Sequence, residues 1–298
     1  MPLNALNPRS MVELNKIVIY GVGLIGGSFA LALRRAGAVR EIVGFGRSRA
    51  TLEDAMSLGI LDRIGADEAA EVADADLILL ATPVAQMSAI LSRIAPHLGA
   101  NTLLTDGGST KGDVVAAAYA NLGDKVGQFV PAHPIAGAEK SGASAALAEL
   151  YQGKRVVLTP LPENSDAAVA SVRLFWELCG AAVCELTPAQ HDEVFAAVSH
   201  LPHLLSFALV HDIAQRDDRD LLLSFAASGF RDFTRIAASS PEMWRDICLA
   251  NREALLGELG RYQRELETLH TALVAADAAK LEEIFSLACS VRSGWAPK

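Results

Sequence analysis

Cysteine is scarce and dispersed in this chain, and no two cysteines form a C-x-x-C pair. With only four thiols at such spacing, we expect reduced cysteines that are buried as small hydrophobic side chains, as in a cytoplasmic protein. A block of lysine or arginine is also missing, and the net charge is −9. This balance argues against nucleic acid and against an anionic membrane surface as partners.

Long hydrophobic runs are missing too. The first 15 residues hold no apolar signal core, and no apolar run approaches the ~20 residues of a membrane span, so no membrane segment is expected. We expect residues 1–15 to form a loose tail, with either Met1 or Met11 as the true start. Hydrophobic residues make up 51% of the 298 residues and charged ones only 20%, which predicts a sizeable core and room for two domains.

A glycine-rich turn near the start is the most informative motif. The apolar strand Lys16–Tyr20 leads directly into G-x-G-x-x-G at residues 21–26, and Ser28–Arg35 reads as an apolar helix. This context is typical of a dinucleotide site, in which the pyrophosphate lies on the free N–H groups of the helix N-terminus. The alternative is a glycine-rich turn without a ligand. We predict a bound nicotinamide or flavin nucleotide, with contacts from Gly21, Gly23, Leu24, Ile25 and Gly26.

Short apolar strands alternate with helical segments from Lys16 to about Leu186. The strand candidates are Lys16–Tyr20, Ile42–Gly46, Leu77–Ala81, Thr102–Asp106, Phe129–Ala132, Arg155–Thr159 and Ala182–Leu186. Such alternation predicts an α/β fold with a Rossmann-type, doubly wound and mostly parallel sheet over residues 16–186. Thr187-Pro188 then predicts a helix start, and the strand pattern stops. We expect an all-helical domain over residues 187–298 and a ligand in the crevice at the carboxyl ends of the strands.

Three clusters stand at predicted strand ends. Thr82-Pro83 is either a turn that caps the next helix or a cofactor contact. Ser109, in a glycine-rich loop over residues 106–112, offers a hydroxyl near the expected nicotinamide, unless it only caps the following helix. His133 lies between two prolines at a strand end, and histidine is the side chain best suited to exchange protons near neutral pH. We therefore predict that His133 is catalytic.

Three further histidines occur in the helical half. His200 and His203 lie three residues apart and share a helix face, whereas His191 falls on the opposite face. One metal ion could not bind all three, so we expect no metal site. Instead, we expect Pro202 to kink the helix and turn one of the pair, His200 or His203, toward the crevice, the other being structural.

Two arginines follow at helical spacing. Arg231 and Arg235 lie four residues apart beside apolar neighbours, where a guanidinium makes a good clamp for a carboxylate. The alternative is an ion pair with Asp232 or Glu242 on a solvated face.

Together these motifs resemble the prephenate/arogenate dehydrogenase family, the oxidoreductases of tyrosine biosynthesis. The resemblance runs from about Lys16 to Val291 and is carried by the segments 21–26, 106–112, 133–139, 191–192, 199–203, 229–235 and 244–246. It implies a nicotinamide-binding domain, a helical dimerisation domain and an active site between them. No regulatory domain is expected after the last helix, and no mutase module before the glycine turn.

The family's substrate is a cyclohexadiene with a hydroxyl at C4 and a carboxylate at C1. Hydride leaves C4 for the nicotinamide, the hydroxyl proton is drawn off, and the ring carboxylate departs as CO2. The resemblance implies that His133 accepts a hydrogen bond from this hydroxyl and that Ser109 positions the hydroxyl and the nicotinamide. It further implies that Arg235 binds a substrate carboxylate, that His203 lines the pocket, and that Arg231 and Glu139 are gate or supporting charges.

The end of the second strand departs from the NAD pattern. An NAD site usually has an acidic residue there, whereas this chain has Gly46, Arg47, Ser48 and Arg49. Cations and a hydroxyl suit a 2′-phosphate, so we expect Arg47 and Ser48 to contact the cofactor and NADP+ to be favoured over NAD+. The alternative is that Arg47 stacks on the adenine of NAD+.

Other functions and the quaternary state also follow from the sequence. A β-hydroxyacid dehydrogenase-like reductase would share the glycine turn but gives no reason for His133-Pro134, and a non-catalytic nucleotide sensor would need no base. Prephenate and arogenate differ only in a keto or amino group, and the sequence does not separate them; nor does it predict inhibition by tyrosine.

The helical domain is expected to form a homodimer. The segments Leu204–Leu209 and Leu221–Phe225 carry more apolar surface than one thin layer of helices can bury internally.

Overall fold

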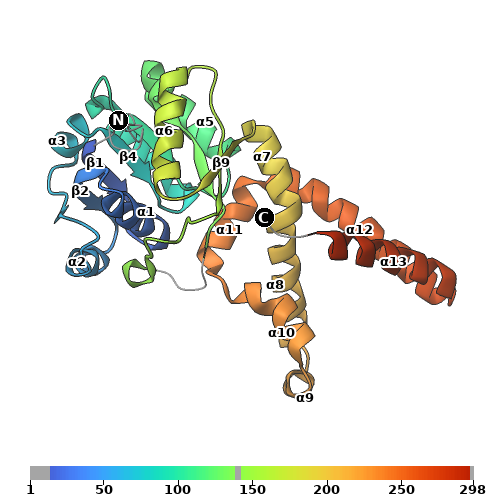
Figure 1. The fold of residues 1–298 in the computed structure, drawn as a ribbon. Helices are drawn as coiled ribbons and strands as arrows, with labels where there is room; N and C mark the ends of the chain where they lie inside the picture. Colours follow the sequence, from blue (N-terminus) through green and yellow to red (C-terminus); the bar gives the residue numbers. More distant parts are fainter. Residues whose placement is uncertain (1–13, 138–141, 296–298) are drawn as a thin grey trace, which may run out of the picture. The chain divides into compact units, whose positions relative to one another are not determined.

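The computed structural model describes residues 14–137 and 142–295. Contacts divide the chain into two compact units, residues 1–251 and residues 252–298, and each is described by itself (Figure 1). The first strand begins at Leu14, within the expected tail, and the alternative starts at Met1 and Met11 lie outside the described residues. A domain boundary at 186/187 stays a prediction.

The first unit is built on a six-stranded sheet in the order β3-β2-β1-β4-β5-β6, and every pairing in it is parallel. Its strands are β1 (Leu14–Tyr20), β2 (Val39–Phe45), β3 (Arg63–Ile64), β4 (Leu77–Leu80), β5 (Leu103–Asp106) and β6 (Phe129–Val130). The chain reverses direction across the sheet between β1 and β4, which is where an open parallel sheet binds its ligand. The short strand β3 was not expected from the sequence.

Helices cover both faces of this sheet, as expected for strands that are apolar on both sides. Ile17 and Ile19 of β1 pack with the helices α1 and α6, whereas Val18 packs with α3, α4 and α5. The helices are α1 (Leu24–Arg35), α2 (Arg49–Ser57), α3 (Glu68–Ala73), α4 (Met87–Ile94), α5 (Gly112–Leu122) and α6 (Asp166–Leu178). The doubly wound arrangement predicted from the sequence is therefore confirmed.

A second, three-stranded sheet carries part of the expected strand pattern. It has the order β7-β8-β9, with β7 (Ala132–Pro134) antiparallel to β8 (Arg155–Leu158) and β8 parallel to β9 (Ala182–Glu185). The single strand expected at Phe129–Ala132 is divided at Pro131, which has no N–H to donate to a ladder. As a result, His133 lies on β7, opposite Val157 of β8.

The rest of the first unit is helical. It comprises α7 (Pro188–Phe195), a π-helical turn at Ala196–His200, α8 (Leu201–Ala214), α9 (Arg219–Ser224), α10 (Ser228–Thr234), a 3₁₀ turn at Arg235–Ala238 and α11 (Pro241–Ala250). Thr187 starts α7 through a capping box with Gln190. The π-helical turn ends at His200, two residues before Pro202, where a kink was expected.

The segment Pro188–Ala214 forms one continuous helical stretch of 27 residues, and an 18-residue window within it has a mean hydropathy of 1.4. By length and composition alone it could cross a membrane, so the expectation that no apolar run approaches the ~20 residues of a membrane span is wrong. In the most apolar part of this stretch 28% is buried in the structure. Ser206 on α8 donates to the carbonyl of Phe233, which packs this helix against α10.

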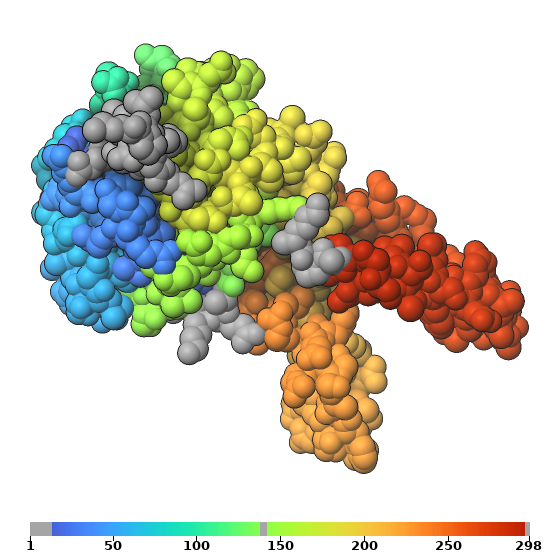
Figure 2. Space-filling model, in the orientation of Figure 1, coloured from blue at the N-terminus to red at the C-terminus, as the bar shows by residue number. Residues whose placement is uncertain are grey.

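Much of the apolar surface that was expected to mediate dimerisation is exposed. Leu221 is 61% exposed and Phe225 is 81% exposed. Both lie in or next to α9, and α9 and α10 (orange) stand out from the sheet-containing part of the same unit (Figure 2).

The cysteines differ from expectation, because only Cys179 is buried, whereas Cys184 and Cys289 are exposed.

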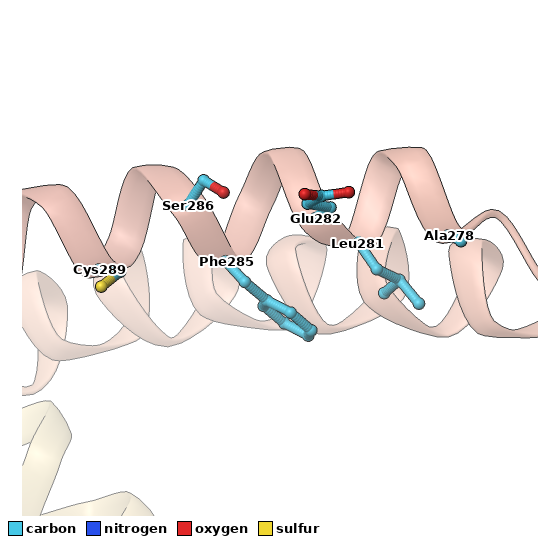
Figure 3. Close-up of a pocket in the computed structure, with 6 residues that line it drawn as sticks. All are labelled: Ala278, Leu281, Glu282, Phe285, Ser286 and Cys289. Carbon is cyan, nitrogen blue, oxygen red and sulfur yellow. The ribbon is translucent and has the colours of Figure 1, made fainter.

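The second unit is a pair of helices, α12 (Arg252–Val274) and α13 (Ala278–Gly294). Asp277 caps α13 by accepting a hydrogen bond from the Lys280 backbone N–H. Figure 3 shows Leu281 and Phe285 pointing to the same side of α13. Phe285 is 58% exposed, so this side of the helix is an uncovered apolar surface.

Candidate active site

The glycine turn between β1 and α1 has the geometry of a dinucleotide site. Gly21 has a φ of 91°, and a Cβ there would lie 2.5 Å from the Ala81 carbonyl oxygen. A Cβ on Gly26 would lie 2.2 Å from the Gly21 carbonyl oxygen, whereas one on Gly23 would meet no atom within 4 Å. Two glycines therefore allow close packing, and the third leaves open space in front of the backbone.

The start of α1 is suited to an anion. Among the residues that the structure describes, no side chain caps this 12-residue helix at Gly23. Its first N–H groups, including those of Leu24 and Ile25, have no partner within the helix and lie at the positive end of its dipole. The Thr82 hydroxyl, after β4, is buried and has no hydrogen-bond partner in the described part of the chain. These features fit a bound NAD(P) pyrophosphate and ribose.

The loop after β2 uses its polar groups within the protein. The Ser48 hydroxyl accepts a hydrogen bond from the Thr51 N–H and so caps α2. Arg47 pairs with Glu242 of α11 at 3.5 Å, and Arg49 pairs with Glu53 at 2.8 Å. The Arg47 and Glu242 side chains are 69% and 51% exposed. The Glu242 carboxylate of α11 therefore lies beside the loop after β2, where the second strand itself ends without an acidic residue.

A buried carboxylate connects the loop that carries Ser109 to the strand that carries His133. Asp106 at the end of β5 accepts hydrogen bonds from the N–H groups of Gly108 and Ala132, each at 2.8 Å. It also accepts one from the ammonium group of Lys111, and neither side chain of this ion pair has exposed surface. Because Ala132 precedes His133 and Gly108 precedes Ser109, Asp106 holds both predicted catalytic residues in one frame.

His133 contacts a second histidine. Its Nδ1 lies 2.8 Å from Nε2 of His191 on α7, and the Nδ1 of His191 lies 2.8 Å from an oxygen of Asp192. Phe195 packs against both rings, with centroids 4.9 and 4.5 Å away. His133 is partly exposed, whereas His191 is fully buried.

The two rings are held in the neutral state. Burial is the main reason why the pKa of His133 lies well below 6.5, and the neighbouring His191 and Lys111 lower it further. Burial also lowers the pKa of His191, although Asp192 opposes this. A neutral His133 can accept a proton, which is what the predicted base requires.

The histidines expected to share a helix face have different surroundings. His200 is buried, with its Nδ1 3.1 Å from the amide nitrogen of Asn251 and a second hydrogen bond to the Ser109 backbone. Burial lowers the pKa of His200 to about 4. The His203 ring stacks on Trp244 at 3.6 Å, and its Nδ1 donates to the Ser199 carbonyl at 2.9 Å. Among the residues that the structure describes, the Nε2 of His203 therefore has no hydrogen-bond partner, whereas His200 forms its hydrogen bonds within the protein.

The two arginines lie at the end of α10. The α-helix ends at Thr234, and Arg235 begins the 3₁₀ turn with helical backbone angles (φ −49°, ψ −41°), so their expected place on one helix face stays a prediction. Burial lowers the pKa of His203, and the nearby charge of Arg235 adds to this effect. Arg231 is instead 78% exposed and lies 3.7 Å from Asp232. Glu139 lies outside the described residues.

Sequence reasoning missed the His191–Asp192 pair and the Asp106–Lys111 pair as parts of the site. Both segments were noted as motifs, but the pattern itself does not show their contacts. His191 and Asp192 are 58 and 81 residues along the chain from their partners His133 and Lys111. The one available signal was the position of Asp106 at a predicted strand end.

Comparisons with known proteins show the family of this chain. Residues 29–185 match the family model described as prephenate dehydrogenase, nucleotide-binding domain, and residues 187–287 match prephenate dehydrogenase, dimerization domain. The chain is 37% identical to prephenate dehydrogenase of Bacillus subtilis over 93% of its own length and 75% of the relative's. It is 34% identical to cyclohexadienyl dehydrogenase of Zymomonas mobilis over 92% of its own length and 94% of the relative's.

Its fold is also close to that of a solved structure. This is the prephenate dehydrogenase from A. aeolicus in complex with hydroxyphenyl propionate and NAD+, at a TM-score of 0.88 and 34% identity. The match covers 95% of this chain and 99% of that chain. The chain therefore belongs to the prephenate dehydrogenase family and is an NAD(P)-linked prephenate/arogenate dehydrogenase of tyrosine biosynthesis.

Proposed function

We propose that His133 is the base of this reaction and that Ser109 positions the substrate hydroxyl beside it. The observation that carries the proposal is the Asp106 carboxylate, which joins the backbone next to Ser109 and the backbone next to His133. Both residues follow or flank strand ends at the crevice where an open α/β sheet binds its ligand. A neutral, partly exposed imidazole can receive a proton from a hydroxyl held there.

The C4 hydroxyl of the cyclohexadiene donates its hydrogen bond to His133, with Ser109 fixing its direction. A bound nicotinamide supplies the acceptor for the hydride that leaves C4. As the C4–H and O–H bonds break, the bond from C1 to its carboxylate also breaks and CO2 departs. The electron pair of that bond enters the ring and completes the aromatic system. The phenolate oxygen of the product then recovers the proton from His133, so the step is balanced without a further reactant.

Recognition of the substrate carboxylates is assigned to Arg235 and His203. A dianionic substrate needs a cation, and a guanidinium binds a carboxylate with two parallel hydrogen bonds. The charge of Arg235 acts on His203, and Trp244 stacks on the His203 ring, so these three groups lie close together. Arg231 and Glu139 are proposed as gate or supporting charges, which agrees with the high exposure of Arg231.

Cofactor binding is assigned to Gly21, Gly23, Leu24, Ile25 and Gly26 at the pyrophosphate, with Thr82 and Pro83 at the next strand end. The preference for NADP+ expected from Arg47 and Ser48 has little support. Ser48 already caps α2, Glu242 pairs with Arg47, and the similar structure from A. aeolicus holds NAD+. We infer that NAD+ is used at least as well as NADP+.

A homodimer in the cytoplasm is the proposed working state. The match to a dimerization domain supports it, as do the exposed apolar side chains of Leu221 and Phe225. The long apolar helix Pro188–Ala214 would lose exposed surface in such a dimer. Sedimentation is expected to give twice the mass of one chain at micromolar concentration.

The test of the proposed roles is turnover of the purified protein with prephenate and with arogenate, followed by absorbance at 340 nm. His133→Asn is expected to lower kcat by roughly 10²–10⁴ and to leave cofactor affinity nearly unchanged. Comparison of initial rates with the two substrates identifies the preferred one. Near-normal turnover of His133→Asn would show that His133 is not the base.

A further inference from the structure

We propose that His191 and Asp192 are positioning residues that hold His133 in one tautomer, with Nδ1 protonated and Nε2 free to accept. This inference rests on the proposed role of His133 as the base. The contacts form one chain: Asp192 Oδ1 to His191 Nδ1 at 2.8 Å, then His191 Nε2 to His133 Nδ1 at 2.8 Å.

At one end of this series of hydrogen bonds, the Asp192 carboxylate acts only as an acceptor. Its two carboxylate oxygens receive the backbone N–H groups of Lys111 at 2.8 Å and Gly112 at 2.7 Å, at the start of α5. Burial opposes ionisation, but the bonds from His191, Lys111 and Gly112 prevail, and the pKa of Asp192 is lowered. The positive end of the α5 dipole also favours an anion at this place. Asp192 is therefore an ionised acceptor.

The direction of every proton in the chain follows from that acceptor. His191 must carry its proton on Nδ1 in order to donate to Asp192. Because His191 is buried and neutral, its Nε2 then has a lone pair and must accept from His133. His133 consequently carries its proton on Nδ1, and its Nε2 has the free lone pair. This is the form of the ring that can take a proton from the substrate hydroxyl.

The groups around the two rings favour the same state. Lys111 lies near both histidines and its charge disfavours protonation of either ring, while its ammonium group is itself paired with Asp106. His200 is the third histidine in the cluster and is likewise neutral. The Asp192 carboxylate favours a cation on His191, but the cost of burying that charge is larger, so the pKa of His191 stays below its ordinary value.

A purely structural role for His191 is the competing explanation, since its ring packs against Phe195 with centroids 4.5 Å apart. Packing alone would place no constraint on which nitrogen of His133 is protonated. The two explanations therefore differ in the tautomer of His133, which can be measured without cofactor or substrate.

The first experiment records ¹⁵N shifts of the histidine rings in the free wild-type enzyme, with His133→Asn used to assign the His133 signals. We expect His133 protonated on Nδ1 at neutral pH. A ring protonated on Nε2 would overturn the proposal, whatever the activity shows, and the tautomer itself is measured in the wild-type enzyme.

The second experiment compares His191→Leu with His191→Gln. Leucine removes the acceptor, so His133 is expected to populate its other tautomer and kcat to fall by roughly 10²-fold or more, with the KM for the cofactor unchanged. The glutamine amide oxygen can still accept from His133 Nδ1, so His191→Gln is expected to keep the tautomer and to lose less than tenfold in kcat. Equal losses of kcat in the two variants, or an unchanged His133 tautomer in His191→Leu, would show that the hydrogen bonds from Asp192 through His191 do not set the tautomer of His133.

The two proposals fail separately. If His133→Asn keeps its turnover but wild-type His133 is protonated on Nδ1, His191 and Asp192 do set the tautomer and the base has been misassigned. If His133→Asn is inactive but wild-type His133 is protonated on Nε2, His133 is the base and its tautomer is not set by His191 and Asp192.

Discussion

Lys111 and Asp106 form an ion pair in which neither side chain has any exposed surface. The pair connects the loop that carries Ser109 to the strand that carries His133, because Asp106 also accepts the N–H groups of Gly108 and Ala132. A buried pair of this kind is costly to break from one side, since the remaining charge has no solvent.

Lys111→Met is therefore expected to lower the free energy of unfolding by about 3–5 kcal/mol, as measured by denaturant titration. The double variant with Asp106→Asn should recover part of this loss, because the unpaired charge is removed as well. Loss of the Lys111 cation should also raise the pKa of His133, so the acid limb of kcat/KM should move to higher pH. A single variant as stable as the wild type would mean that Asp106 is satisfied by the backbone alone.

Arg235→Gln is expected to act mainly on the KM for substrate, because the guanidinium contributes carboxylate binding in the ground state as well as orientation. An increase of roughly tenfold or more is expected from the loss of a charge-assisted hydrogen bond. Arg231→Gln is the matched control, since Arg231 is exposed beside Asp232, and it should change KM by much less. If the control variant shows the larger effect, Arg231 is the clamp.

The free energy of unfolding should decrease as the pH falls below 6.5. In the unfolded chain the histidines take up protons near pH 6.5, whereas in the folded protein the buried histidines stay neutral until the pH is lower. For His200, whose folded pKa is about 4, the contribution is complete above pH 6.5 and is lost between pH 6.5 and about 4. That interval corresponds to about 3 kcal/mol for this one group. Urea titrations at pH 7.5 and pH 5 measure this change in the free energy of unfolding. His200→Gln should make the difference between the two pH values smaller. A free energy of unfolding that is constant over this range would contradict the neutral, buried state of His200.

Cofactor choice should respond to the contact between Arg47 and Glu242. Glu242→Gln frees the Arg47 guanidinium and removes a carboxylate that would repel a 2′-phosphate, so kcat/KM for NADP+ relative to NAD+ should rise about three- to tenfold. Arg47→Asp should lower the same ratio, because it leaves an acidic group where the phosphate would lie. Unchanged ratios in both variants would place the 2′-position of the ribose elsewhere.

Much of the fold was determined by local sequence. The apolar strands, the glycine turn at residues 21–26 and the Thr187 cap predicted a doubly wound sheet followed by helices, because periodicity and turn chemistry act over a few residues. His133, Ser109 and Arg235 were predicted as site residues from their positions near predicted strand ends and helix faces, together with the family resemblance. The division of the Phe129–Ala132 strand at Pro131 could have been read from the missing N–H of proline.

Only the tertiary structure decided how these residues contact one another. It placed Asp106 between the Ser109 loop and the His133 strand, and His191 next to His133, across gaps of 26 and 58 residues. It also brought Glu242 to Arg47, which changed the expectation for the cofactor. Side-chain hydrogen bonds and ion pairs depend on distances of a few ångströms between segments far apart in the chain, and a local pattern carries no information about such distances.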